Sequence, residues 1–331
     1  MPSNQQKLLF LAIIIALALF SRFAYPTFFG SRQPITDNPA TDGRSVPYFA
    51  MQSVEASTST AAEPSATPVA VRPRALMGTA NFTATGDASP PVIADHETLI
   101  ADLDSGSIIY GSHIDERWPL ASVTKLMTAS IVLDHFTLNQ PITVTPAAVA
   151  ADPTATLLQA GDVYTVSDLL HALLLPSSNV AAEAFAGAYG REQFLALMNA
   201  RAAAWGMVHT HYDDPSGLSP GNRTTAGDLL LLAQKIYADY PQILAITRTP
   251  QVTIKELNSG RLVPVKSIND FAGRPDFIGG KTGFTDEADG NLLSIFSYKN
   301  HPVLFVVLGT ADNERFSETL KLLQWFEGNF K

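Results

Sequence analysis

Three short strings along the chain combine side chains that could carry out acyl transfer on a serine. In order they are Ser122-Val123-Thr124-Lys125, Ser177-Ser178-Asn179 and Lys281-Thr282-Gly283. A serine hydroxyl is a poor nucleophile at neutral pH, so it needs a neighbouring base that takes its proton as it attacks a carbonyl. Each string alone is common, because Ser-Ser-Asn also suits a helix start and Lys-Thr-Gly a strand that enters a turn. Their occurrence together indicates a serine acyl-enzyme site.

The first string predicts how Ser122 would be activated. On a helix, residues i and i+3 lie on one face, so the Oγ atom of Ser122 and the Nζ atom of Lys125 can meet. The run 120–133 is almost wholly apolar, as in a buried helix. Burial disfavours the charged form of a lysine, so we expect a lowered pKa that lets Lys125 act as the base. Lys281, as a second cation, would lower that pKa further and would attract an anionic substrate.

The sequence around these strings resembles the low-molecular-weight penicillin-binding proteins, which are the serine D-alanyl-D-alanine carboxypeptidases and their endopeptidase relatives. The resemblance covers about Val92 to Phe326. Its segments are Leu-Ile-Ala-Asp-Leu-Asp-Ser-Gly (99–106), Leu-Ala-Ser-Val-Thr-Lys-Leu-Met-Thr-Ala (120–129), Asp-Pro-Ser-Gly-Leu (214–218), Thr-Ala-Gly-Asp-Leu (225–229) and Lys-Thr-Gly-Phe-Thr (281–285). It implies an α/β (α+β) fold of the DD-peptidase and β-lactamase type, with an antiparallel sheet packed by helices beside a helical lobe.

The resemblance also implies the catalytic roles. Ser122 would be the nucleophile, Lys125 its general base, and Ser177 a relay that passes a proton to the leaving group. The backbone N–H groups of Ser122 and Phe284 would form an oxyanion hole, in which each donor lowers the barrier by about 3 kcal/mol.

A second set of residues would bind the substrate. Asn179 would position the substrate, while Lys281 and Thr282 would recognise its terminal carboxylate. Arg315, near the start of the last helix, is similar in place to a family arginine near that carboxylate. The full implied set is Asn179, Lys281, Thr282, Gly283, Phe284 and Arg315.

Four positions depart from the family pattern. The second string is followed by Val180, and its middle residue is Ser178, where the family usually has Ser-Gly-Asn and then an acidic or small polar residue. Phe284 stands where histidine or tyrosine is common, and Gly227 where some members carry arginine. The hydroxyl and the amide of the second string are kept, so the departures bear on substrate preference more than on the chemistry.

Composition excludes several other classes of protein. The chain has 331 residues, no cysteine and a net charge of -9. The length permits one sizeable domain plus extensions. A binder of phosphate backbones needs a basic face, so we expect no nucleic-acid partner. The lack of cysteine excludes disulfides, thiolate catalysis and zinc sites built on cysteine.

No cofactor or metal is expected. The sequence has no Gly-x-Gly-x-x-Gly or Walker-type loop for a nucleotide. His209 and His211 near Asp213 and Asp214 could be drawn as a zinc site. In the family this stretch is a connecting segment, so its histidines need only be surface or turn residues. A Ser-His-Asp triad is disfavoured because no Gly-x-Ser-x-Gly elbow is present.

The predicted organisation has three parts. Residues 1–26 read as a signal peptide or signal anchor, because Lys7 precedes the apolar run 8–20, and we favour an uncleaved anchor since no Ala-x-Ala-like site follows. Residues 27–91 are rich in Pro, Ser, Thr and Ala and predict a disordered linker. Residues 92–331 would form the serine DD-peptidase domain.

Periodicity predicts strands at both ends of this domain and helices between them. Such an order implies one antiparallel sheet assembled from the two ends, with the active cleft between sheet and helical lobe. The expected strands are 97–103, 107–110, 252–257, 262–267, 292–298 and 303–308. The expected helices contain Ser122 or cover 169–175, 179–189, 192–205, 225–237 and a final stretch from about 313, with caps at Thr165 and Thr225.

The function that this resemblance implies is that of a serine-type D-Ala-D-Ala carboxypeptidase. It would cleave peptidoglycan stem peptides through an acyl-enzyme at the extracytoplasmic face of the cell membrane, anchored or secreted, and β-lactams would inhibit it. A DD-endopeptidase that cleaves cross-links is one alternative. It is slightly favoured because the chain ends just after the last expected helix, without the C-terminal β domain of some carboxypeptidases. A β-lactamase is disfavoured, because no Glu-x-x-Leu-Asn setting lies between the second and third strings. A non-catalytic β-lactam sensor or peptidoglycan-binding module is disfavoured, because all three strings are complete.

Overall fold

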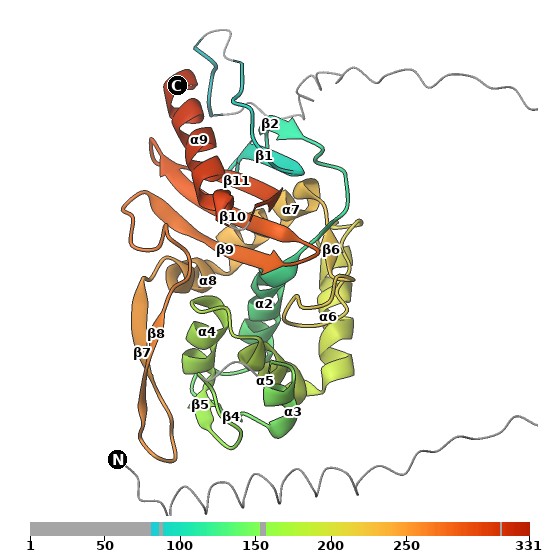
Figure 1. Ribbon diagram of the computed structural model, residues 1–331, viewed down its shortest axis with the longest axis vertical. Coiled ribbons are helices and arrows are strands. Elements are labelled where there is room, and N and C mark those ends of the chain that lie inside the picture. The colour runs from blue at the N-terminus through green and yellow to red at the C-terminus, as the bar shows by residue number, and fades with distance from the viewer. Residues whose placement is uncertain (1–80, 86–88, 153–156, 312) are drawn as a thin grey trace, which may run out of the picture. The chain divides into compact units, whose positions relative to one another are not determined.

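The computed structural model describes residues 81–85, 89–152, 157–311 and 313–331 (Figure 1). The expected anchor, residues 1–26, and most of the expected linker lie outside the described residues, so both stay predictions. Within the described ranges, no helix is both long enough and apolar enough to cross a bilayer.

A five-stranded antiparallel sheet forms the centre of the domain, with strand order β2-β1-β11-β10-β9. The first strand pairs with the last along its whole length, from Glu97 opposite Leu308 to Asp102 opposite Val303. The sheet is therefore assembled from both ends of the domain, as predicted, and β9 is left at an edge. The strands are β1 (Glu97–Asp102), β2 (Ile108–Ser112), β9 (Phe277–Thr285), β10 (Asp289–Tyr298) and β11 (His301–Thr310).

Both faces of the sheet are buried, and the alternation of side chains along β11 shows how. Leu304 and Val306 pack with the helical lobe, whereas Phe305 and Val307 pack with α9 (Glu314–Asn329) on the opposite face. Figure 1 shows α9 lying along the sheet. Strands buried on both faces are continuous apolar runs, which is why β10 and β11 were readily predicted.

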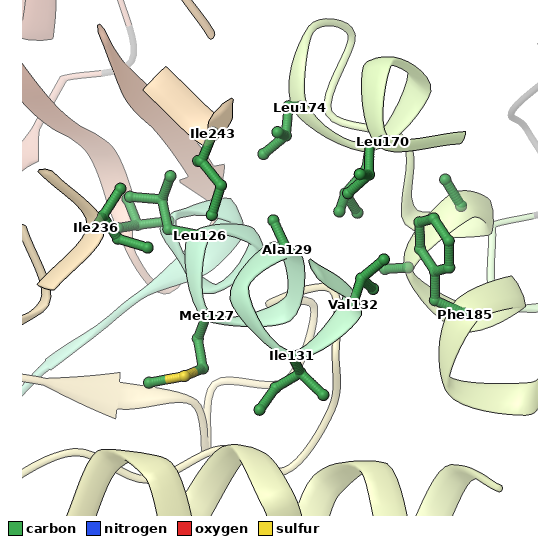
Figure 2. Close-up of a cluster of buried hydrophobic side chains, with 14 of the residues drawn as sticks. Leu126, Met127, Ala129, Ile131, Val132, Leu170, Leu174, Phe185, Ile236 and Ile243 are labelled. Atoms are coloured by element: carbon green, nitrogen blue, oxygen red, sulfur yellow. The ribbon is translucent and has the colours of Figure 1, made fainter. Parts of the chain in front are cut away.

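The helical lobe is built around α2, which is buried from Lys125 to Val132. Figure 2 shows its apolar side chains surrounded by residues of other helices. Leu170, Phe185 and Ile243 belong to the same buried cluster. The helices are η1 (Ala121–Thr124, a 3-10 turn), α2 (Lys125–His135), α3 (Pro146–Ala150), α4 (Val166–Leu174), α5 (Asn179–Tyr189), α6 (Arg191–Ala204), α7 (Ala226–Asp239) and α8 (Pro241–Thr247).

Three small two-stranded sheets complete the described fold, and one of them corrects a prediction. The strands expected at 252–257 and 262–267 form a separate hairpin, because only one face of it is buried, through Ile254, Val263 and Val265. A strand inside the main sheet would need apolar side chains on both faces. The three pairs are β3 (Trp118–Pro119) with β6 (Arg223–Thr224), β4 (Pro141–Thr143) with β5 (Val163–Thr165), and β7 (Gln251–Lys255) with β8 (Leu262–Lys266).

Residues 81–85 pack against the end of the chain. Thr83 and Lys331 exchange two backbone hydrogen bonds of 3.0 Å each. Phe82 is buried against the rings of Tyr298 and Phe326, with centroids 6.0 and 5.2 Å away. Ordered packing thus already occurs upstream of Val92, within the range assigned to the linker.

Candidate active site

The junction between η1 and α2 brings Ser122 and Lys125 together. Ser122 lies in the 3-10 turn and Lys125 is the first residue of α2. In a 3-10 turn, side chains three residues apart eclipse one another. The Nζ atom of Lys125 accordingly lies 2.7 Å from the Oγ atom of Ser122. The predicted pairing of nucleophile and base is therefore present in the geometry.

Lys125 is fully buried, and its amine has two further partners. Nζ lies 2.7 Å from the Oδ1 atom of Asn179 and 2.7 Å from the carbonyl oxygen of Ser216. Burial lowers the pKa of Lys125 to about 7, although the negative charges of Asp214 and Asp152 oppose this shift. A lysine with this pKa is neutral in a large fraction of molecules at neutral pH, as a general base must be.

The loop that supplies the Ser216 carbonyl is organised by a buried carboxylate. Asp214 accepts hydrogen bonds from the backbone N–H groups of Ser216, Gly217 and Ser219, at 2.6, 2.6 and 2.5 Å. Gly217 has a φ of +88°, and a Cβ atom there would lie 1.8 Å from the carbonyl oxygen of Ala121. Only glycine fits this close approach to the turn that carries Ser122.

The second string forms a strained turn at the start of α5. Ser178 caps the helix by accepting a hydrogen bond from the N–H of Ala181. Ser177, just before it, has a φ of +64°, which costs a non-glycine residue roughly 1–2 kcal/mol. This conformation accompanies a 2.8 Å hydrogen bond that Ser177 Oγ accepts from the Nζ atom of Lys281.

Asn179, the last residue of that string, is held on both sides. Its Oδ1 atom faces Lys125, and its Nδ2 atom donates a 2.9 Å hydrogen bond to the Oδ2 atom of Asp152. Asp152 follows α3 and was not singled out in the sequence. No local pattern could have found it, because 27 residues separate it from Asn179.

Lys281 lies on the edge strand β9 and is buried. It donates to Ser177 and, at 2.9 Å, to the carbonyl oxygen of Thr282. Burial holds the pKa of Lys281 well below its usual value, and the positive charges of Lys125 and Arg315 lower it further. Arg315, in the first turn of α9, is thus close enough to act on Lys281 electrostatically. A carboxylate placed beside these groups would favour the charged form of Lys281.

The third string runs against the turn that carries Ser122. A Cβ atom on Gly283 would lie 3.0 Å from the carbonyl oxygen of Leu120 and 3.2 Å from the backbone nitrogen of Ser122. The backbone of β9 therefore adjoins the N–H group that we expect in the oxyanion hole. The side chain of Thr282 is buried, whereas Phe284 is 44% exposed.

The histidines near the Asp-Pro-Ser-Gly-Leu segment have other partners. His211 Nε2 lies 2.8 Å from Asp213 Oδ1, and the backbone N–H of His209 donates to Asp228 Oδ2. Among the residues that the structure describes, no group of three or more potential metal ligands converges.

Together the side chains form two connected clusters. One joins Ser122, Lys125 and Asn179, and the other joins Ser177 and Lys281. A hydroxyl beside a buried amine of lowered pKa can attack a carbonyl, and a second lysine on a strand edge can attract an anion. The arrangement suits acyl transfer from a substrate with a negatively charged end.

Comparison with known proteins gives the same family as the motifs. The chain matches the family model Peptidase_S11, described as D-alanyl-D-alanine carboxypeptidase, over residues 84–312. It is 33% identical over 267 residues to a D-alanyl-D-alanine endopeptidase of Escherichia coli (strain K12), which covers 77% of this chain and 84% of that relative.

Solved structures confirm the expected fold class. The D-alanyl-D-alanine carboxypeptidase of Mycobacterium tuberculosis H37Rv matches with a TM-score of 0.67 and 28% identity, covering 73% of this chain and 94% of that one. Penicillin-binding protein D2 of Listeria monocytogenes, in its ampicillin-bound form, matches with a TM-score of 0.62 and 27% identity, covering 72% and 99%.

Proposed function

The chain belongs to the D-alanyl-D-alanine carboxypeptidase family Peptidase_S11, and from this we propose that it removes the terminal D-alanine of peptidoglycan stem peptides through an acyl-enzyme on Ser122. The single observation that carries the proposal is the 2.7 Å contact between the hydroxyl of Ser122 and the buried amine of Lys125. A buried amine of lowered pKa is the base that such a serine requires.

In the acylation step, Ser122 Oγ attacks the carbonyl carbon of the scissile D-alanyl bond while Lys125 Nζ takes the hydroxyl proton. The developing oxyanion would be stabilised by the N–H groups of Ser122 and Phe284. The position of Gly283 beside Ser122 supports this role. Lys281, Thr282 and the nearby Arg315 would bind the terminal carboxylate of the substrate.

The departing amine needs a proton for the peptide bond to break. Ser177 would supply it, because its hydroxyl receives a hydrogen bond from Lys281 and can pass on its own proton. The Lys125 ammonium would then return its proton to the oxygen of Ser177, which leaves Lys125 neutral again. Water attacks the ester while Lys125 takes a proton from it, and that proton passes to Ser122 Oγ as the ester bond breaks. A β-lactam would acylate Ser122 in the same way, as supported by the likeness to an ampicillin-bound penicillin-binding protein.

Cleavage of D-alanyl cross-links is a second candidate for the same site. It is favoured by the 33% identity to an endopeptidase. The two reactions share all of the chemistry above and differ in whether the leaving amine belongs to a single D-alanine or to a neighbouring stem peptide.

The family acts on cell-wall peptidoglycan, outside the cytoplasm. We further propose that residues 1–26 anchor this protein in the membrane and that the following residues act as a tether, as the sequence predicts. Membrane fractionation of cells that express the full chain, before and after a carbonate wash, tests the anchor. Release of the full-length protein into the soluble fraction would contradict it.

Purified muropeptides provide the test of function. The full chain is incubated with monomeric pentapeptide and with cross-linked dimer, and the products are analysed by mass spectrometry. Loss of one alanine from the pentapeptide supports the carboxypeptidase, and separation of dimers supports the endopeptidase. No change in either substrate, or hydrolysis of a β-lactam alone, would overturn the proposed function.

A further inference from the structure

We propose that Asp152 is a positioning residue, which fixes the orientation of the Asn179 amide and thereby directs the lone pair of a neutral Lys125 at Ser122. The inference rests on the proposed function, because it concerns how the base accepts the hydroxyl proton. Asp152 lies outside the three motifs, and among the described residues it is linked to Ser122 by hydrogen bonds through Asn179 and Lys125.

The two ends of the Asn179 amide differ in the hydrogen bonds that they can form. Its oxygen can only accept hydrogen bonds, whereas its nitrogen can only donate them. An ionised carboxylate is purely an acceptor, so Asp152 selects the Nδ2 end at 2.9 Å. The Oδ1 end must then face Lys125, where it lies 2.7 Å from Nζ.

The neutral amine of Lys125 is oriented by its neighbours. A neutral amine has two N–H bonds and one lone pair, and here it has three neighbours at 2.7 Å. Two of them, Asn179 Oδ1 and the Ser216 carbonyl oxygen, can only accept. Both N–H bonds are therefore used, and the lone pair is left for the hydroxyl of Ser122. A flipped amide would instead offer an N–H group that competes with Ser122 for the lone pair.

The proton balance follows from this arrangement. As the bond from Ser122 Oγ to the substrate carbonyl carbon forms, the O–H bond of Ser122 breaks and its hydrogen binds the lone pair of Lys125. The resulting ammonium keeps its hydrogen bonds to Asn179 and Ser216 and donates its new one to the serine oxygen. The reaction thus needs no rotation of the amine, which lowers the reorganisation required at the moment of attack.

The charges around Lys125 give Asp152 a second, separable effect. Lys125 is faced by Asp214 from the loop before β6, by Asp152 after α3, and by Lys281 from β9. The two carboxylates raise the pKa of Lys125 against the larger effect of burial, whereas the charge of Lys125 lowers the pKa of Lys281. Removing the charge of Asp152 therefore moves the pH at which Lys125 becomes neutral, while removing its acceptor alters how fast the neutral form reacts.

The experiment measures acylation of the full chain by a fluorescent penicillin as a function of pH. We compare Asp152→Asn, which keeps an acceptor without the charge, with Asp152→Ala, which loses both. In both variants the acidic limb of the rate profile should shift to lower pH. The plateau at high pH should fall about tenfold or more in Asp152→Ala and less than about threefold in Asp152→Asn, within the range of acid–base effects.

Two controls separate a positioning role from a structural one. Asp239→Asn removes an exposed carboxylate on α7 that pairs only with Lys235 among the described residues, and should leave both limb and plateau unchanged. In an Asn179→Ala background, Asp152→Ala should lower the plateau no further, because its effect passes through Asn179. Losses that add fully in the double variant would indicate a general structural defect and overturn the inference.

The outcomes also distinguish this inference from the proposed function. If the wild-type protein is not acylated at Ser122, the proposed function fails and the inference falls with it. If the wild-type protein is acylated and Asp152→Ala reaches the same plateau, the function stands and only the inference is overturned.

Discussion

The regions around Lys125 and around Glu97 both bury an ionisable side chain, yet only one of them is built for chemistry. Burial lowers the pKa of Lys125 to about 7 and raises that of Glu97 to about 8, so each group is shifted towards its neutral form. Glu97 lies in β1 and accepts a 2.7 Å hydrogen bond from the N–H of Ala226, at the start of α7. Among the described residues, its Oε1 atom has no hydrogen-bond partner.

The difference lies in what surrounds each group. All three neighbours of the Lys125 amine are fixed, and one is a hydroxyl that can react. The Glu97 carboxyl fixes a helix start to the sheet, and among the described residues it forms no hydrogen bond with a hydroxyl. A shifted pKa alone therefore indicates burial. A shifted pKa in a group that also contacts a reactive hydroxyl indicates a functional site.

The largest effect should come from Ser122→Ala. Without the hydroxyl no acyl-enzyme can form, so penicillin labelling and product formation should fall by at least about 10⁴-fold, the scale seen when a serine nucleophile is removed. The measurement is covalent labelling by mass spectrometry. Labelling that persists would place the nucleophile elsewhere.

Removal of the base should have the next largest effect. Lys125→Ala should slow acylation by about 10³-fold, because general-base assistance accounts for roughly 10²–10⁴ of a rate. The rate is measured under single-turnover conditions at pH 8. Glu97→Gln serves as the matched control, and a comparable loss of rate in that variant would erase the distinction between the two regions.

The pH dependence of acylation should follow Lys125 and not Glu97. The reactive form of the lysine is neutral, so the rate should rise with pH to a midpoint near 7 and fall about tenfold per pH unit below it. Glu97→Gln should show the same midpoint. A midpoint that moves in this variant would mean that Glu97 is coupled to the site.

The smallest effect is on stability alone and concerns Glu97. Between pH 4.5 and 8 the unfolded chain releases the proton of Glu97 while the folded protein keeps it, so the free energy of unfolding falls as pH rises. Glu97→Gln should lack this fall, which amounts to on the order of 3 kcal/mol between wild type and variant.

Urea unfolding of both proteins at several pH values measures this difference. Lys125 makes the free energy of unfolding rise with pH, between about pH 7 and 10.5. This contribution is the same in the wild type and in Glu97→Gln, so it cancels in the comparison. A wild-type protein whose stability relative to the variant does not change between pH 5 and 8 would contradict the assignment.

Much of the fold could be predicted from the sequence because its signals are local. Continuous apolar runs marked β10 and β11, and capping residues such as Thr165 and Thr225 marked helix starts. Strand β9 is absent from the expected strands, because Gly279 and Gly280 interrupt its short apolar run. Both positions require glycine, because a Cβ atom on Gly279 would lie 2.9 Å from the Cα atom of Leu244, and one on Gly280 would lie 2.2 Å from the carbonyl oxygen of Leu293.

The contacts of the candidate site likewise divide into local ones, which the sequence predicts, and long-range ones, which it does not. Ser122 and Lys125 are three residues apart, so their contact follows from helical geometry. The partners that orient them come from distant segments, since Asp152 and the Ser216 carbonyl reach the site through tertiary packing. Asp152 belongs to no motif, and the Asp-Pro-Ser-Gly-Leu segment marks Ser216 without showing that its carbonyl faces Lys125.

The pairing of β1 with β11 has a consequence for biogenesis. Glu97 and Leu308 are neighbours in the sheet but about 200 residues apart in the chain, and such non-local pairing makes folding slow. A ribosome that adds about 5–20 residues per second needs roughly 10–40 s to synthesise the stretch between them. For that time β1 lacks the partner on one of its edges, and we expect the nascent chain to depend on protection from aggregation until its last strand emerges.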